Sequence, residues 1–296
     1  MHADEILSTI IVAGLFATIA LLEFLFGIYK SKTRFGKDWI IDLVSLAQLA
    51  LIMKPAALFL SLAAASFLWP AGRGVLDGLP FWVAFLIVFV PDDFLHYWYH
   101  RMAHQWNWMW PMHRTHHTPQ QYQVTIAFRE NWSWLFFMPG FWWMGLMIYL
   151  GLGDVVIVST MVIGVHNVML HYGFTWDRKL YQAPIMRRGM WGVERIFNTP
   201  SLHRGHHGLG EHGVPFGNYG QTLFVWDQIF GTATFMEDRI PEQYGTIAED
   251  ESKWYQQLWW PFFRLPSVKY SDKNLDFLGE QGKKPKSKKP LIGPFF

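Results

Sequence analysis

Residues 81–104 read FWVAFLIVFVPDDFLHYWYHRMAH. This stretch begins as an apolar, aromatic run and ends on two histidines, His100 and His104. A run of about 20 mostly apolar residues is long enough to cross a bilayer as a helix. Residues i and i+4 share one face of a helix, so the two imidazoles point the same way. The stretch therefore predicts a membrane-spanning helix that carries a histidine pair at its end.

Two copies of one five-residue pattern follow this helix. They read His113-Arg114-Thr115-His116-His117 and His203-Arg204-Gly205-His206-His207. On a helix, positions i, i+3 and i+4 lie on one face, so each copy is expected to aim three imidazoles at one point. Imidazole is the commonest side-chain ligand of zinc, copper, iron and nickel. The three groups together predict a histidine-rich metal centre.

The composition indicates a membrane protein. The chain of 296 residues is 51% hydrophobic and 16% charged, with 17 Trp, whereas soluble domains carry about 25% charged residues. The net charge of +2 gives no reason to expect a nucleic-acid partner. The absence of cysteine excludes disulfides, iron–sulfur clusters and thiolate zinc sites.

We expect an all-α integral membrane protein with about four to five transmembrane helices and a cytoplasmic, histidine-rich helical cap. The second span is interrupted by Lys54-Pro55, so it is either one kinked helix or a short hairpin. The expected spans are residues 6–29, 39–69, 81–99, 132–150 and 155–172.

Basic residues near the span ends predict the orientation. They cluster after the first span, at residues 30–37, and again in the tail. If both segments are cytoplasmic, the histidine motifs gather on the cytoplasmic side of the membrane. We expect residues 1–280 to form a single domain, and the basic tail 281–296 to be disordered.

Asp92 and Asp93 lie one to two turns before the first histidine pair. A carboxylate there could accept a ring N–H from a histidine ligand, or it could hydrogen-bond the helix bundle instead. Glu23 and Asp42 lie near the basic loop and are expected to be structural ion partners.

The donor set indicates the chemistry. Soluble di-metal oxygenases use Glu-x-x-His pairs, and zinc proteases use His-Glu-x-x-His; neither pattern accompanies these histidines. Eight or more imidazoles can hold two divalent ions, which suits iron and dioxygen chemistry on a lipid. Two other classes stay open, a histidine-rich membrane metal transporter and a haem-type electron-transfer membrane protein.

Three segments carry a family resemblance. They are residues 93–117, the run Asn198-Thr-Pro-Ser-Leu-His203-Arg-Gly-His206-His207-Gly, and the run Asn218-Tyr-Gly-Gln with Trp226-Asp-Gln-Ile-Phe-Gly-Thr. Together they resemble the fatty acid hydroxylase/sterol desaturase superfamily, nearest to its alkylglycerol monooxygenase-like and sterol C5-desaturase-like branches. The resemblance implies a membrane-bound di-iron oxygenase, with its histidine-rich catalytic cap in residues 96–117 and 198–235. Such enzymes use dioxygen and two electrons to hydroxylate, desaturate or cleave a lipid or sterol.

The resemblance also implies a ligand set. His171, in His171-Tyr-Gly, fits a further ligand position at a span end, and His166 could replace or join it. Asp93, His96 and Asn198 are expected to support the ligands without binding metal themselves. The catalytic and metal-binding residues implied are His100, His104, His113, His116, His117, His171, His203, His206 and His207.

The implied cofactor is two iron ions, for which zinc can substitute on overexpression. Gln105 stands where alkylglycerol monooxygenases typically have Glu, which counts against ether cleavage. The chain contains no fused cytochrome b5-like segment and no Gly-rich dinucleotide motif. Electrons are therefore expected from an external donor, which could be a cytochrome b5-like protein, a ferredoxin/reductase pair or a small reductant.

Overall fold

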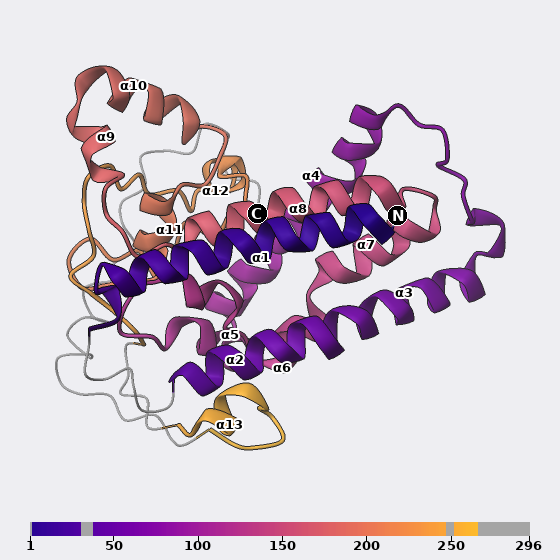
Figure 1. Ribbon diagram of the computed structural model, residues 1–296, viewed down its shortest axis with the longest axis horizontal. Coiled ribbons are helices and arrows are strands. Elements are labelled where there is room, and N and C mark those ends of the chain that lie inside the picture. Colours follow the sequence, from indigo (N-terminus) through magenta and orange to yellow (C-terminus); the bar gives the residue numbers. More distant parts are fainter. Residues whose placement is uncertain (1, 31–37, 247–251, 266–296) are drawn as a thin grey trace.

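The described part of the chain is mostly helical (Figure 1). The computed structural model describes residues 2–30, 38–246 and 252–265; the expected disordered tail lies outside them. Two short strands, β1 (Gly208–Leu209) and β2 (Gln243–Tyr244), pair antiparallel. The helices are α1 His2–Leu25, η1 Ile28–Lys30, α2 Asp38–Gln48, η2 Leu49–Met53, α3 Lys54–Leu68, η3 Pro70–Gly72, α4 Phe81–Gln105, α5 Trp110–His117, η4 Val124–Phe128, α6 Trp132–Phe137, α7 Pro139–Tyr149, α8 Gly153–Leu170, α9 Arg178–Gln182, α10 Pro184–Val193, α11 Pro200–His206, α12 Val225–Ile229 and α13 Trp254–Leu258.

Four described helices are long and apolar enough to cross a membrane. Large apolar side chains on them face outward, such as Phe67, which is 84% exposed, and Trp82, which is 72% exposed. Exposing so much apolar surface to water would be unfavourable by about 25 cal/mol per Å². The prediction of an all-α integral membrane protein is therefore confirmed. The four spans are Asp4–Leu25, Asp38–Leu68, Phe81–Gln105 and Gly153–Leu170.

The second span is one continuous helix rather than a hairpin. Its middle, Leu49–Met53, widens into a π-helix immediately before Lys54-Pro55. Proline has no N–H to donate, and its ring collides with the carbonyl four residues earlier. The wider π-turn accommodates this collision, so α2 and α3 continue along one path without a break.

The expected span at residues 132–150 was wrong as a single helix. The segment divides into α6 and α7 at Met138, whose backbone is extended (φ −59°, ψ 115°). Met138 precedes Pro139, and the proline ring disfavours the helical conformation at the residue before it. α7 then runs beside α3, where Ser61 Oγ donates to Trp142 O (2.7 Å) and Tyr149 Oη donates to Trp69 O (2.8 Å).

The helices α1, α4 and α8 all run toward one end of the bundle. Along α1 and α8, Val12 lies beside Gly164, and the Glu23 carboxylate accepts from Gly173 N (2.7 Å) near the other end, so these helices are parallel. α7 runs antiparallel to α4, with Trp143 Nε1 donating to Val88 O (3.0 Å). The segments that follow α4 and α8, which carry the histidine motifs, consequently meet at the same end.

The membrane bundle has its own apolar core between α4, α7 and α8. Val88, Met144, Met147 and Val155 are buried there. Gly145 lets α7 approach α3 closely, because a Cβ at this position would lie 2.6 Å from Ser61 Cβ. Close approach through small residues is the usual way in which membrane helices pack.

Arg129 ties the histidine end of the bundle together. Its buried guanidinium forms ion pairs with Asp38 (2.9 Å) and Asp42 (3.0 Å) of α2, which confirms Asp42 as a structural ion partner. Its Nε donates to Thr115 O (3.1 Å), between the histidines of α5. The Arg129 side chain therefore fixes α5 relative to the second span.

Replacing Arg129 with Met should lower the free energy of unfolding by about 3 kcal/mol, because it leaves two partly buried carboxylates without their cation. Thermal unfolding in detergent micelles measures this loss. The exposed Arg188→Met is the matched control and should unfold like the wild type. Equal stability of both variants would contradict the anchoring role.

Candidate metal centre

Local sequence signals explain why the two motifs form short helices. α5 begins at Trp110-Pro111 and α11 at Pro200, and proline is favoured in the first turn of a helix. Thr199 caps α11, with its Oγ1 accepting from Leu202 N (3.4 Å). α4 continues past the expected end at residue 99 to Gln105, so its first histidine pair lies on the helix itself.

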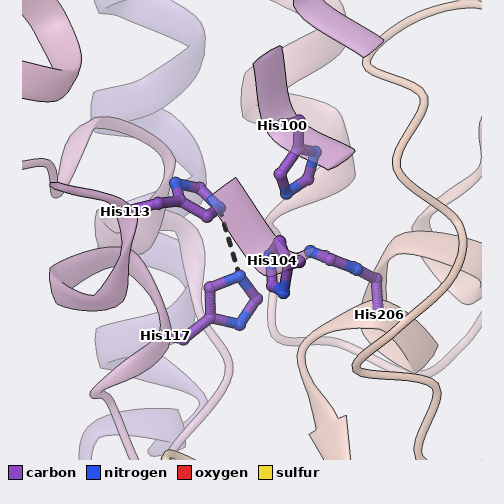
Figure 2. A group of neighbouring side chains, drawn as sticks. All are labelled: His100, His104, His113, His117 and His206. Atoms are coloured by element: carbon purple, nitrogen blue, oxygen red, sulfur yellow. Dashed lines mark hydrogen bonds between the residues drawn. The ribbon is translucent and has the colours of Figure 1, made fainter. Parts of the chain in front are cut away.

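Nine of the predicted ligands converge into two adjacent groups. Within each group, one ligand atom per residue lies within 4.8 Å of every other. Figure 2 shows the first group, whose rings approach one another from α4, α5 and α11. The five-histidine group consists of His100, His104, His113, His117 and His206, and the four-histidine group of His116, His171, His203 and His207.

The structure corrects the expectation that each motif aims all three imidazoles at one point. In the first motif, His113 and His117 belong to the five-histidine group, whereas His116 belongs to the other. In the second motif, His203 and His207 belong to the four-histidine group, whereas His206 belongs to the five-histidine group. Each short helix thus contributes to both groups, which locks their relative positions.

The outer ring nitrogens are hydrogen-bonded to backbone carbonyls. The Nδ1 atoms of His100, His171 and His206 lie 2.8 Å from Tyr219 O, Asn167 O and Gly217 O, respectively. Each Nδ1 must carry the proton to donate to its carbonyl, so Nε2 keeps a free lone pair. The Nε2 atoms of His100, His104 and His206 are buried without any hydrogen-bond partner. Unpaired buried acceptors facing one another are what a bound cation would satisfy.

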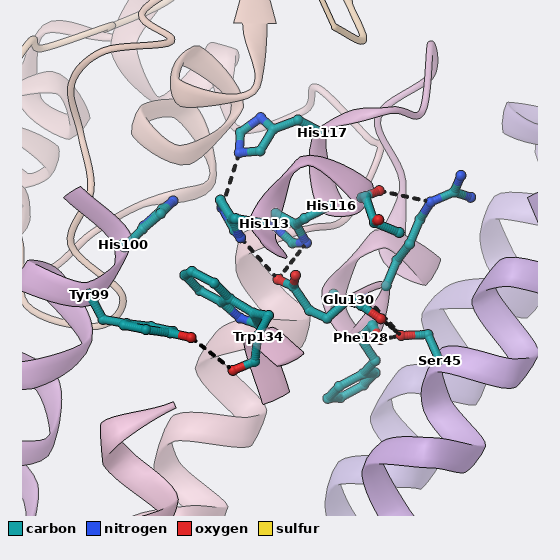
Figure 3. A network of polar contacts seen from close by, with 12 residues as sticks. Ser45, Tyr99, His100, His113, His116, His117, Phe128, Glu130 and Trp134 are labelled. Atoms are coloured by element: carbon teal, nitrogen blue, oxygen red, sulfur yellow. Dashed lines mark hydrogen bonds and ion pairs between the residues drawn. The ribbon is translucent and has the colours of Figure 1, made fainter. Parts of the chain in front are cut away.

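The Glu130 carboxylate lies beside the Nδ1 atoms of two further rings (Figure 3). Its Oε1 lies 3.4 Å from His113 Nδ1 and 3.3 Å from His116 Nδ1, one ring from each group. Ser45 of α2 holds the Glu130 backbone, accepting from its N (2.6 Å) and donating to its O (2.8 Å). Sequence reasoning missed this residue; the polar run Arg129-Glu130-Asn131 before an apolar segment was the available signal.

The spacing of the inner nitrogens fits metal ligands. Nε2 of His171 lies 3.2 Å from Nε2 of His116 and 2.9 Å from Nε2 of His203. His171 already donates through Nδ1, and the single lone pair on its Nε2 can accept only one of these two contacts as a hydrogen bond. Two nitrogens bound to one ion at 2.0–2.1 Å are about 3.0–3.4 Å apart. The residues present therefore fit a pair of divalent cations better than they fit a hydrogen-bond chain.

Burial keeps the imidazoles neutral, as metal ligands must be. It lowers the pKa of His171 to about 4. Burial and repulsion from neighbouring imidazoles also lower the pKa of the other predicted ligands outside the spans, to well below the ordinary value for histidine. These are His113, His116, His117, His203, His206 and His207. Burial raises the pKa of Glu130, a shift that a nearby cation would oppose.

The other predicted residues lie outside both groups. His166, expected as a possible ligand, instead hydrogen-bonds Asn198 O through Nε2 (3.1 Å). The His96 ring lies 5.8 Å from the His100 ring and 6.3 Å from the Trp134 ring. Its place beside the first group agrees with a supporting position.

Asp93 does not take the role proposed for it as acceptor of a ring N–H. Its carboxylate accepts from Thr222 N (2.8 Å) and Trp226 Nε1 (2.9 Å), while His100 uses Tyr219 O. The second possibility, a structural hydrogen bond, is the observed one. Asp93 therefore supports the centre indirectly, by holding on α4 the loop that carries Tyr219.

Asp227 completes this loop and was not anticipated. Its carboxylate accepts from Tyr219 N (2.8 Å) and Gly220 N (2.7 Å), fixing the peptide whose carbonyl faces His100. Asn198 Nδ2 donates to Gly220 O (2.5 Å), which agrees with its predicted supporting place. Two buried aspartates and one asparagine thus position a single backbone carbonyl.

The histidine motifs and the loop behind them lie inside the match to one family model. A family model described as fatty acid hydroxylase matches residues 85–232, half of the chain. The chain belongs to the fatty acid hydroxylase family. This confirms the resemblance noted in the sequence.

Several curated relatives of this hydroxylase-family chain carry names of enzymes that act on lipids. Alkylglycerol monooxygenase of Xenopus tropicalis is 34% identical over 55% of the chain and 32% of its own length. The Homo sapiens alkylglycerol monooxygenase is 30% identical over 67% of the chain and 42% of its own length. The ornithine lipid hydroxylase OlsE of Rhizobium tropici is 28% identical over 55% of the chain and 43% of its own length. The chain thus spans less than half the length of these three relatives. No solved structure matches it.

The metal-free protein should lose thermal stability as the pH falls below about 6.5, the ordinary pKa of histidine. The folded-state pKa values lie below that value, so between the two the unfolded chain binds more protons and acid favours unfolding. Melting temperatures in detergent between pH about 7.5 and about 5.5 measure the trend. A melting temperature independent of pH in this window would contradict the buried neutral cluster.

Glu130→Gln should weaken binding of Zn²⁺ about 10–100-fold, because an amide holds the two Nδ1–H groups less firmly than a carboxylate. Competition with a chelator measures the affinity, and circular dichroism checks that the helices persist. Glu211→Gln, an exposed glutamate of the same chain, is the matched control. Unchanged affinity in Glu130→Gln would remove Glu130 from the centre.

Proposed function

We propose that this protein is a membrane-bound hydroxylase that inserts one oxygen atom from dioxygen into a lipid, using two iron ions held by the two histidine groups. The observation that carries the proposal is the convergence of nine buried imidazoles with their Nε2 atoms inward. Iron bound there would supply dioxygen activation with two electrons from an external donor. The catalytic residues of the proposal are these nine histidines.

The protein's own contribution is to hold the centre and exclude water. All nine histidines of the proposal come from helix ends or short helices, and outer hydrogen bonds to backbone carbonyls fix the rings of His100, His171 and His206. Neither group contains a carboxylate within the described part of the chain. Neutral imidazoles suit a divalent transition metal, and the affinity order also explains why zinc could occupy the groups after overexpression.

A lipid substrate follows from where the centre lies. His100 and His104 continue a membrane-spanning helix, and His171 directly ends another. A substrate dissolved in the bilayer needs only a short displacement along these helices to reach the groups. The curated relatives that are named for alkylglycerols and ornithine lipids favour a substrate with a polar head and an alkyl chain.

The two competing functions fit the geometry less well. A transporter is expected to bind its ion near the middle of the membrane, between discontinuous helices. Here the ligands lie at the ends of the spans, nearly all fully enclosed. A haem site needs axial histidines facing a wide planar cofactor, whereas neighbouring Nε2 atoms here are 2.9–3.2 Å apart.

The proposed orientation places the histidine end in the cytoplasm. The basic residues of the sequence between the first two spans, and of the tail, support it through the positive-inside rule. Soluble or membrane-bound electron donors would approach from that side. We propose residues 1–280 as the unit that carries this activity.

Lipid mass spectrometry of cells supplied with isotopically heavy dioxygen tests the proposal. Cells expressing the protein should contain a lipid that has gained one heavy oxygen atom. His207→Ala should reduce the amount of this product more than about 100-fold. This loss exceeds the one that is typical when a hydrogen-bond partner of a metal ligand is replaced. His212→Ala, whose ring lies beside Glu211 outside both groups, should leave it unchanged. A desaturated lipid, or no change in any lipid, would contradict hydroxylation.

A further inference from the structure

We propose that α10 and the segment after it form a second membrane-contacting element, lying in the leaflet on the histidine side. The surface consists of Ile185, Met186, Val193, Ile196 and Phe197. The inference concerns a surface away from the metal groups and does not depend on the hydroxylase activity.

α10 exposes large apolar side chains. Ile185 is 86% exposed, and no described residue of α10 is buried. Basic side chains of this segment are exposed as well. Arg187, whose side chain is 51% exposed, pairs with Glu237 (2.5 Å), Arg188 is exposed, and the Arg195 guanidinium lies 4.7 Å from the centre of the Phe235 ring. Exposed apolar groups next to arginines are typical of a helix that lies in the interface between lipid and water.

Along the direction of the membrane-spanning helices, the segment after α10 lies at the same height as residues within α4 and α8. Asn198 O accepts from His166, which is about 7 Å of helix rise before His171 in α8. Phe197 pairs with Leu223, whose backbone N donates to Asp93 (3.1 Å), about 10 Å before His100 in α4. Ile196, 52% exposed, and Phe197 consequently face outward at a depth where the spans are surrounded by lipid.

The apolar surface is also continuous with the membrane helices. α12 begins two residues after Leu223, and its last residue, Ile229, is exposed. The next residue, Phe230, packs against Trp98 of α4 at 4.9 Å between ring centres. A continuous apolar surface from α10 to a span favours the bilayer as the occupant over a separate protein. Figure 1 places α10 at the end of the bundle that also holds α11, beside the long helices. A helix of this kind inserts about 5–10 Å into the leaflet.

The absence of native cysteine allows a direct test on the full chain. Single variants Ile185→Cys and Ile196→Cys are labelled with the environment-sensitive fluorophore NBD and placed in phosphatidylcholine nanodiscs. Both labels should show blue-shifted emission, lose intensity when the lipids carry a nitroxide near the headgroup, and resist quenching by iodide in the water. Glu211→Cys, an exposed polar site, is the matched control and should show the opposite pattern.

Iodide quenching at Ile185→Cys and Ile196→Cys, with no effect of nitroxide lipids, would overturn the proposal and leave a protein partner as the occupant of this surface. Circular dichroism and metal content of each labelled variant confirm that the fold and the histidine groups persist. Since lipid contact is measured without turnover, the result is separate from the success or failure of the hydroxylase proposal.

Discussion

The orientation of buried imidazole rings is the constraint on which the rest of this structure depends. A neutral imidazole has one N–H and one lone pair, so fixing the donor side fixes the acceptor side. Backbone carbonyls take the Nδ1–H of His100, His171 and His206, and Glu130 faces the Nδ1 atoms of His113 and His116. The lone pairs then point into the centre. Without a cation there, these buried acceptors would be costly to bring together.

Much of the helical architecture can be understood as delivering those outer hydrogen-bond partners. Asp93 on α4 and Asp227 on α12 hold the loop whose Tyr219 carbonyl orients His100. Arg129 and Ser45 hold α5 and Glu130 against α2. The candidate metal centre is consequently connected to two spans, through α4 and α2, by polar groups that are themselves buried. Changes far from any ligand can therefore disturb it.

The sequence was sufficient for the parts that depend on local patterns. Apolar length located the four long spans, and histidine spacing located eight of the nine histidines that converge; the family resemblance added His171. Other features depend on tertiary contacts. The middle histidine of each motif joins the opposite group because the histidine rings of α5 and α11 meet between the two groups, with the His117 ring 4.8 Å from the His206 ring. Spacing of i, i+3 and i+4 cannot predict such a contact. Glu130 belongs to no histidine motif, and only the tertiary fold brings it beside His113 and His116. The break at Met138 was readable from Pro139, but the hydrophobicity of residues 132–150 obscured it.

The most direct test is anomalous X-ray scattering from crystals of the iron-loaded protein, collected at the iron edge. The account predicts two peaks per chain, one enclosed by His100, His104, His113, His117 and His206, the other by His116, His171, His203 and His207. A single peak per chain, or a peak centred between His113, His116 and Glu130, would contradict it.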